Sequence, residues 1–308
     1  MRLTPTGATL IELIVVLALG GAVGALMLSM VVRQQRFHTG VSAVVEGKRS
    51  TRDAIELLAR ELRPIATSTA ALAPHGSDIY AMSDSAIRFR AHLGSSVVCA
   101  IDVDRTTLTL PGITGPINQR LTSFIVLPRA GDSLFIFNRG TTPSRDDDTW
   151  HRFALAANVG GGFCPLRPIG LATNDAEGAF ALSLALTTPV PATIDVGAPI
   201  RFFRPTAYSV YRTSVGDWAL GISACVGGTC GVRQPISGPY RPTTSGSPKG
   251  IALEFLDTSG ALTTTPSDVA RIDVVARTRS SVPLDIAHIR GTRYHDSLTT
   301  SIAVRNRL

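Results

Sequence analysis

The stretch that decides the fold is residues 13–32, LIVVLALGGAVGALMLSMVV, twenty residues without a charged side chain. An α-helix rises about 1.5 Å per residue, so this stretch would be roughly 30 Å long, the thickness of a bilayer core. Arg33 and Arg36 close it on the C-terminal side. A cleaved secretory signal has a shorter apolar region. The sequence therefore predicts a retained membrane-spanning helix over residues 13–32.

An acidic residue stands at the very start of this apolar stretch. Residues 1–7 carry one basic side chain, Arg2, and are followed by Ala8-Thr9-Leu10-Ile11-Glu12. A carboxylate inside the bilayer costs a few kcal/mol of insertion free energy unless it finds a partner. Glu12 is therefore expected either to sit in the lipid headgroup layer or to pair with a cation.

The string Gly7-Ala8-Thr9-Leu10-Ile11-Glu12-Leu13 resembles the cleavage and methylation motif of type IV prepilins, usually G-F-T-L-I-E-L, at six of seven positions. The resemblance implies that residues 1–7 are a leader, that a prepilin peptidase cuts after Gly7, and that Ala8, which replaces the usual Phe, becomes an N-methylated first residue. It also implies that Glu12 pairs with the N-terminal amine of a neighbouring subunit during assembly.

Residues 49–63, RSTRDAIELLARELR, and the ending at residues 304–307 are similar to PilW-like minor pilins and to minor pseudopilin J. This implies a minor pilin or pseudopilin that assembles into, initiates or caps a type IV pilus or a type II secretion pseudopilus. The implied partners are the prepilin peptidase, other pilins or pseudopilins, the inner-membrane assembly platform and membrane lipid. The implied location is the inner membrane, with a cytoplasmic N-terminus and an extracytoplasmic head, and later the pilus or pseudopilus.

The helical pattern continues beyond the apolar stretch. Apolar residues recur every three or four positions; they are Phe37, Val41, Val44 and Val45, then Ile55, Leu58, Ala59 and Leu62. Polar residues at 48–53 interrupt this stripe, and Pro64 ends the helix at about Arg63. The sequence predicts one helix over residues 8–63, roughly 80 Å long, half in the membrane and half supporting a head.

Residues 65–308 contain short β-type runs separated by turns rich in Gly and Pro, and no convincing helical pattern. Typical predicted strands are residues 86–92, 97–103, 200–204, 207–213 and 270–277. The predicted fold class is therefore α+β: a long N-terminal transmembrane and amphipathic helix packed against an antiparallel, pilin-like β head.

The four cysteines predict at least one disulfide. Cys225 and Cys230 bracket Val226-Gly227-Gly228-Thr229, and a Gly-Gly centre suits a two-residue hairpin turn. The cysteines would then form the next, non-hydrogen-bonded pair, close enough for a disulfide. Half of a metal site would need two more ligands nearby. Cys99 and Cys164 would pair by elimination or remain free thiols.

The formal net charge is +7, and 28 of the 30 basic residues are arginines. They are scattered along the chain, whereas a phosphate-binding footprint should form a patch or stripe, so no specific nucleic-acid partner is predicted. Without a HExxH, GxSxG or phosphate-loop pattern, neither an enzyme activity nor a cofactor or metal site is predicted. The alternative functions are a pilin-like adhesin or DNA-uptake subunit and, third, a membrane-anchored extracytoplasmic enzyme.

Overall fold

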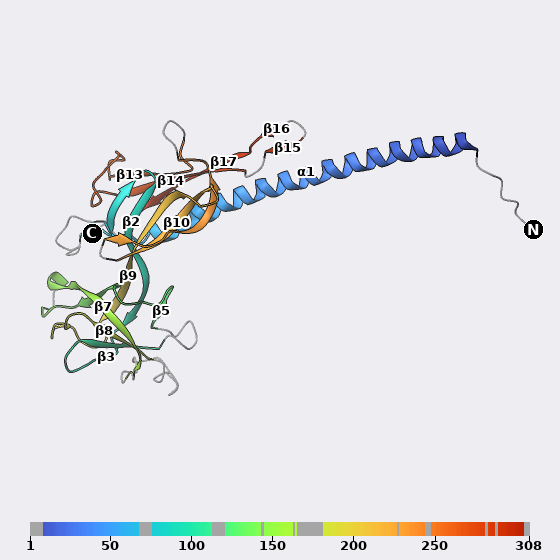
Figure 1. Ribbon diagram of the computed structural model, residues 1–308. Helices are drawn as coiled ribbons and strands as arrows, with labels where there is room; N and C mark the ends of the chain where they lie inside the picture. The colour runs from blue at the N-terminus through green and yellow to red at the C-terminus, as the bar shows by residue number, and fades with distance from the viewer. Residues whose placement is uncertain are drawn as a thin grey trace, which may run out of the picture.

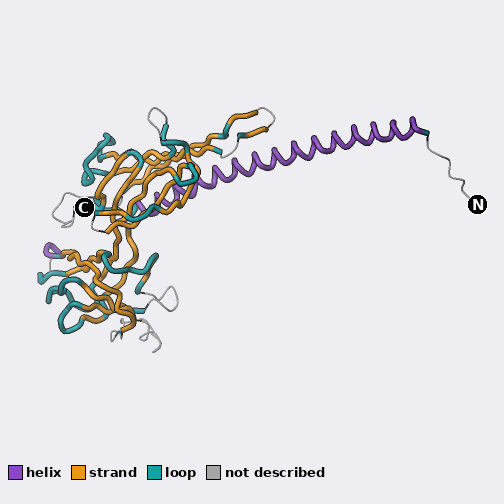
Figure 2. The backbone as a smooth tube through the Cα atoms, in the orientation of Figure 1, coloured by secondary structure: helices purple, strands orange, loops and turns teal. Residues whose placement is uncertain are grey.

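The structure is a computed structural model that describes residues 9–67, 76–112, 121–142, 145–162, 164, 181–226, 228–243, 248–280, 283–286 and 289–304. A single long helix, α1 (Leu10–Leu62), carries a β-rich head at its C-terminal end (Figures 1 and 2). The N-terminal half of α1 projects away from the head. The combination of one helix and a large antiparallel sheet confirms the predicted α+β class.

Helix α1 begins and ends where local chemistry dictates. Thr9 is the N-cap, and Arg63, directly before Pro64, is the C-cap. Arg63 still has helical dihedral angles (φ −60°, ψ −38°), but Pro64 has no backbone N–H to donate and its ring clashes with the preceding turn, so the helix cannot continue. The predicted span of 8–63 therefore matches the observed helix to within a residue or two, while residues 1–8 lie outside the described part of the chain.

Among the described residues, fifteen strands join one antiparallel sheet. They are β1 (Ile79–Ser83), β2 (Ala86–Val97), β3 (Ala100–Ile101), β4 (Thr107–Leu110), β5 (Ser123–Phe124), β6 (Ser133–Asn138), β7 (Thr149–Gly162), β8 (Ala181–Leu186), β9 (Pro199–Arg212), β10 (Trp218–Val226), β11 (Thr229–Cys230), β12 (Gln234–Tyr240), β13 (Ile251–Leu256), β14 (Arg271–Arg279) and β17 (His295–Ala303). Strands β15 (Leu284–Ile286) and β16 (Ile289–Thr292) form a separate hairpin, and η2 (Arg145–Asp147) is a single 3₁₀ turn.

The head contains two hydrophobic cores. The first core packs the end of α1 against the sheet; it includes Leu58, Leu62, Phe89, Ile272 and Val274. The second lies in a lobe that α1 does not reach; it includes Leu134, Leu155, Leu184, Ile200 and Phe202. Figure 1 shows this second lobe, with β3, β7 and β8, set apart from the lobe that surrounds α1.

Strands β2 and β9 run through both lobes. The sequence predicts two shorter strands, 200–204 and 207–213, yet β9 is continuous from Pro199 to Arg212 and includes Pro205. The backbone N–H of Arg90, which is paired with Pro205, points to Asp78 of the chain before β1 (2.8 Å). The nitrogen of Pro205 therefore faces the opposite side, between the last β9 pair with β6 (Phe203) and the first with β10 (Thr206). Because β9 changes its partner from β6 to β10 at this point, the backbone N–H that Pro205 lacks has no ladder hydrogen bond to make.

Two of the polar residues that interrupt the helical stripe, Ser50 and Thr51, are buried, whereas the four charged residues around them are exposed. Ser50 lies against β12, where its hydroxyl bonds Ser237 Oγ (3.0 Å) and accepts from the backbone N–H of Gly238 (3.0 Å). Its carbonyl accepts from the hydroxyl of Tyr240 (3.2 Å). By contrast Phe37, Val41 and Val45, which the pattern places on the head-facing stripe, are exposed. The head therefore begins to cover α1 at Gly40, and it contacts the helix through hydrogen bonds of hydroxyl groups as well as through apolar packing.

Thr51 makes the second polar contact of this seam. Its hydroxyl lies 2.9 Å from the carbonyl of Gly47 and 3.1 Å from Thr278 Oγ1, and both threonines are buried. A hydroxyl buried without a partner costs about 1–3 kcal/mol, whereas replacing both partners by apolar groups of the same shape is nearly neutral.

We predict that Thr51→Val alone lowers the free energy of unfolding by about 1–3 kcal/mol, because Thr278 loses its partner. The double variant T51V/T278V should recover most of that loss. Urea unfolding of the detergent-solubilised full chain measures both. Thr39→Val, on the exposed part of α1, should change the free energy by less than about 0.5 kcal/mol. Additive losses in the double variant would show that the two hydroxyls do not interact.

Candidate functional site

The first half of α1 is an uncovered apolar surface. Every residue from Thr9 to Thr39 is exposed, and none of the most apolar eighteen-residue window is buried against the rest of the chain. Exposed apolar patches of more than a few hundred Å² mark membrane or protein contact sites. The helix is long and apolar enough to cross a bilayer, as the sequence predicts.

Glu12 lies at the start of this surface, in the first turn of α1. Its carboxylate accepts a hydrogen bond from the backbone N–H of Thr9 (2.9 Å), and its own backbone N–H donates to Thr9 Oγ1 (3.4 Å). These reciprocal bonds are a capping box, which satisfies two backbone donors that a helix start leaves unpaired. The pattern Thr-x-x-Glu is the sequence signature of a capping box. From the sequence Glu12 is interpreted as an intersubunit partner, and this local role is not identified.

Capping leaves the charge of Glu12 in place. One carboxylate oxygen, Oε2, accepts both bonds from Thr9, and the side chain is exposed. The positive end of the helix dipole favours an anion at this position. Glu12 can therefore cap its own helix and still accept a bond from a cation supplied by another molecule. Gly7 and Ala8, the predicted cleavage and methylation positions, lie outside the described residues.

Both predicted disulfides are present, and both lie in the head, remote from Glu12. Cys225 pairs with Cys230 across the β10–β11 turn, with the Cα atoms 3.9 Å apart. Val226 and Thr229 form the pair next to the turn, as the sequence predicts, and Gly228 has a positive φ of 90°. Such a φ is open to glycine without steric cost.

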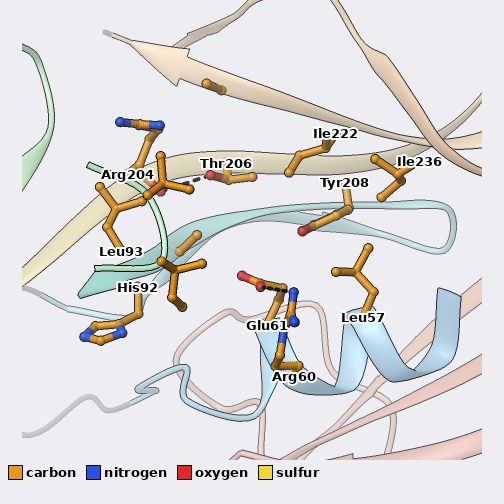
Figure 3. A pocket seen from close by; sticks show the side chains of 14 residues that line it. Leu57, Arg60, Glu61, His92, Leu93, Arg204, Thr206, Tyr208, Ile222 and Ile236 are labelled. Atoms are coloured by element: carbon orange, nitrogen blue, oxygen red, sulfur yellow. Dashed lines mark hydrogen bonds and ion pairs between the residues drawn. The ribbon is translucent and has the colours of Figure 1, made fainter. Parts of the chain in front are cut away.

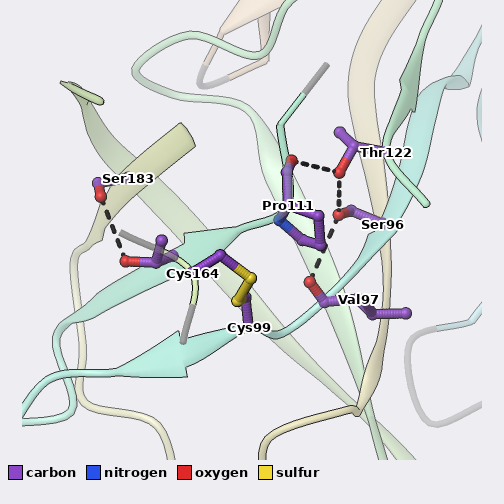
Figure 4. Close-up of a disulfide and its surroundings, with 8 residues drawn as sticks. Ser96, Val97, Cys99, Pro111, Thr122, Cys164 and Ser183 are labelled. Atoms are coloured by element: carbon purple, nitrogen blue, oxygen red, sulfur yellow. Dashed lines mark hydrogen bonds between the residues drawn. A yellow bond between two sulfur atoms is a disulfide. The ribbon is translucent and has the colours of Figure 1, made fainter. Parts of the chain in front are cut away.

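Cys99 and Cys164 form the second disulfide, with a Cα separation of 5.5 Å, so the pairing by elimination is confirmed over the free-thiol alternative. It joins the start of β3 to the chain that follows β7 (Figure 4). Nearby hydroxyls tie the same lobe together: Thr122 Oγ1 donates to the carbonyl of Pro111 (2.7 Å) and bonds Ser96 (2.7 Å). The two cysteines of the Cys99–Cys164 disulfide are 65 residues apart in the sequence, whereas those of Cys225–Cys230 are five residues apart.

The difference in loop length predicts unequal stabilisation. By the chain-entropy relation, a crosslink over 65 residues contributes about 4 kcal/mol and one over five residues about 2 kcal/mol. The variant C99S/C164S should therefore lose roughly twice as much free energy of unfolding as C225S/C230S, measured by urea unfolding at equal protein concentration. Equal losses, or a larger loss from the short hairpin crosslink, would contradict this account.

A pocket of about 280 Å³ lies where the end of α1 meets β2, β9 and β10 (Figure 3). Its lining is mostly apolar and includes Leu57, Leu93, Tyr208, Ile222 and Ile236. Two ion pairs involve residues that line the pocket: Arg60 of α1 with Glu61 (3.4 Å), and Arg204 with Asp132 (2.7 Å). Burial, and then the nearby Glu61 carboxylate, raise the pKa of Tyr208, so its hydroxyl stays protonated at neutral pH.

Asp147, in the acidic run at residues 146–148, is hydrogen-bonded by the loop that precedes it. The Asp147 carboxylate accepts from the hydroxyl of Thr142 (2.6 Å) and from the backbone N–H groups of Thr141 (2.7 Å) and Thr142 (3.0 Å). These bonds, that of the Thr142 hydroxyl first, lower the pKa of Asp147 to about 2. Within the described ranges, no three His, Cys, Asp or Glu side chains gather as metal ligands would.

Comparisons with protein-family models, with curated proteins and with solved structures found no match. The case for a function therefore rests on the chemistry of the chain itself. Its most distinctive feature is an apolar helix whose first half is uncovered. The carboxylate of Glu12 caps the start of this helix, and its other end lies in a disulfide-bonded head.

Proposed function

We propose that this chain is a minor pilin or pseudopilin that assembles into, initiates or caps a type IV pilus or a type II secretion pseudopilus. The observation that carries the proposal is the position of Glu12: an exposed carboxylate in the first turn of an apolar helix that no other part of the described chain covers. The likeness of residues 7–13 to the prepilin motif supports it.

An uncovered apolar helix needs a bilayer before assembly and neighbouring helices after it. In lipid the Glu12 charge is costly unless it is paired, and breaking a buried ion pair by removing one partner costs about 3–5 kcal/mol. Cleavage after Gly7 would create a free amine on Ala8 and expose it at the end of each subunit. Pairing this amine with Glu12 of a neighbour would neutralise both charges and fix the axial register between subunits.

The head supports a position outside the cytoplasm and a minor role. Disulfides persist in oxidising compartments and are rare in the cytosol, so the two crosslinks support the proposed extracytoplasmic position of the head. Two separate cores make the head larger than a simple filament subunit needs. A bulky head of this kind suits a subunit present once or a few times, at the start or tip of a filament.

Glu12→Gln separates the two roles of this side chain. Glutamine also serves in a capping box, so α1 should stay helical and inserted. The lost charge should abolish co-purification with the other pilins or pseudopilins of the host filament, while membrane insertion stays unchanged. Glu46→Gln, an exposed acid on α1 beyond the apolar stretch, is the matched control and should assemble normally. Normal assembly of the Glu12 variant would overturn the pairing mechanism.

Processing is tested by the intact mass of the membrane form. We expect a chain that begins at Ala8, with or without one added methyl group, whenever the prepilin peptidase is present. Gly7→Val should leave the leader attached, because the bulky side chain blocks the scissile position. A wild-type chain that still carries residues 1–7 in cells with an active peptidase would rule out the prepilin assignment.

A further inference from the structure

One face of the sheet carries arginine and aromatic side chains in alternation. Residues of β9 with even numbers, such as Ile200 and Phe202, enter the cores, so the odd-numbered ones point to the opposite face. Strand register places side chains of β2, β6 and β7 beside them: His92 pairs with Phe203, Phe135 with Arg201, and Phe137 with Trp150. We call this surface the arginine–aromatic face; it comprises Tyr80, Arg88, Arg90, His92, Phe135, Phe137, Trp150, Arg152, Arg201, Phe203, Tyr211 and Arg233.

The side chains of this face stack on one another. Four guanidinium groups lie over rings, with distances to the ring centre of 5.6 Å for Arg90 on Tyr80, 5.9 Å for Arg88 on Tyr80, 4.8 Å for Arg201 on Trp150 and 5.6 Å for Arg233 on Tyr211. Ring pairs continue the array, with centroids 5.4 Å apart for His92 and Phe203, 5.3 Å for Phe135 and Phe203, and 5.3 Å for Phe137 and Trp150. The result is a layer of flat groups on a rigid sheet.

The charge of the face is positive. Arg152, Arg201 and Arg233 are exposed, and the outward positions of β2, β6, β7 and β9 include no acid. The carboxylate of Asp78 contacts the face and is paired there with buried Arg90 (2.8 Å). This ion pair holds Arg90 between two rings, with its guanidinium 5.6 Å from the centre of Tyr80 and 4.9 Å from that of Phe135. Burial raises the pKa of Asp78, and the Arg90 charge opposes that rise. Burial and then Arg201 lower the pKa of His92, as expected in a positive environment.

The face is long enough for a polymer. From Arg201 to Tyr211 the chain advances ten residues along β9, about 33 Å at 3.3 Å per residue. Between these two ends the turn of the β10–β11 hairpin contacts the face, since the carbonyl of Gly228 accepts a hydrogen bond from Arg88 (2.7 Å). The arginines that form it come from β2, β7, β9 and the chain between β11 and β12, which explains why they look scattered along the sequence. Strand pairing converts them into the stripe that a phosphate backbone requires.

We propose that the arginine–aromatic face binds single-stranded nucleic acid. Arg152, Arg201 and Arg233 would contact phosphates, and bases would stack on the half-exposed rings of Trp150, Phe203 and Tyr211 or on the guanidinium planes beside them. Single strands fit better than a duplex, because a duplex hides the flat faces of its bases. This binding activity goes beyond the assembly role and does not depend on it.

The electrostatic part is tested with a fluorescein-labelled twenty-nucleotide oligo(dT) and the full chain in non-ionic detergent. We expect anisotropy to report binding that weakens as salt rises. The variant R201Q/R233Q should lower the slope of log K against log salt by about 1.4, since each single-strand phosphate contact contributes about 0.7. R52Q/R212Q removes two exposed arginines that lie off the face and should leave the slope unchanged. No binding at 50 mM salt, or equal effects of the two variants, would overturn the proposal.

The stacking part is tested at Trp150. Trp150→Ala should weaken oligo(dT) binding roughly 5- to 150-fold, and Trp150→Phe, which keeps a ring, should restore most of the affinity. Urea unfolding checks that both variants remain folded. Polyphosphate of equal charge should bind more weakly than oligo(dT) and should not respond to Trp150→Ala. Equal binding of the two polyanions, with no effect of the alanine variant on either, would show a surface for anions in general and overturn the assignment to nucleic acid.

Discussion

Strands β2 and β9 pair at eleven registered positions, from Ala86 opposite Ser209 to Val97 opposite Pro199. Both hydrophobic cores lie on one side of this two-stranded ladder, and the arginine–aromatic face lies on the other. The ladder changes its outer partner from β6 to β10 beside Pro205, and close to this point its register shifts by one residue between His92 and Gly94 of β2. A one-residue slip would exchange the two faces, so the register decides the position of every feature of the head.

Helix α1 belongs to two environments, and its sequence changes accordingly. Up to Thr39 the helix is exposed and predominantly apolar, and it needs lipid or other helices to cover it. From Gly40 onward it is progressively covered by the head, and small or hydroxyl-bearing residues such as Ser50 and Thr51 let backbone and side-chain hydrogen bonds form at close range. The head is therefore fixed to the helix by directional contacts, while the free half has only non-directional ones. That division suits a subunit whose anchor must move from lipid into an assembly while its head keeps one orientation.

Local chemistry allowed much of the fold and part of the candidate site to be predicted. Pro64 ends α1 by steric exclusion, and Gly-Gly between Cys225 and Cys230 produces a hairpin within six residues. The sequence does not predict that β9 is continuous through Pro205, because whether a missing N–H matters depends on the strand next to it, and that strand comes from elsewhere in the chain. The burial of Ser50 and Thr51 leaves no local signal for the same reason: Ser237, Tyr240 and Thr278 bind them from more than 180 residues away.

By itself the sequence determined the long apolar helix, the acid at its start and the β character of the head, because these follow from hydropathy, backbone sterics and contacts between near neighbours. Only the tertiary structure decided that the head has two cores, that Cys99 reaches Cys164, and that scattered arginines meet aromatic rings on one face. Each of these depends on the register between distant strands, which is selected by packing of the whole sheet and leaves no local signal in the chain.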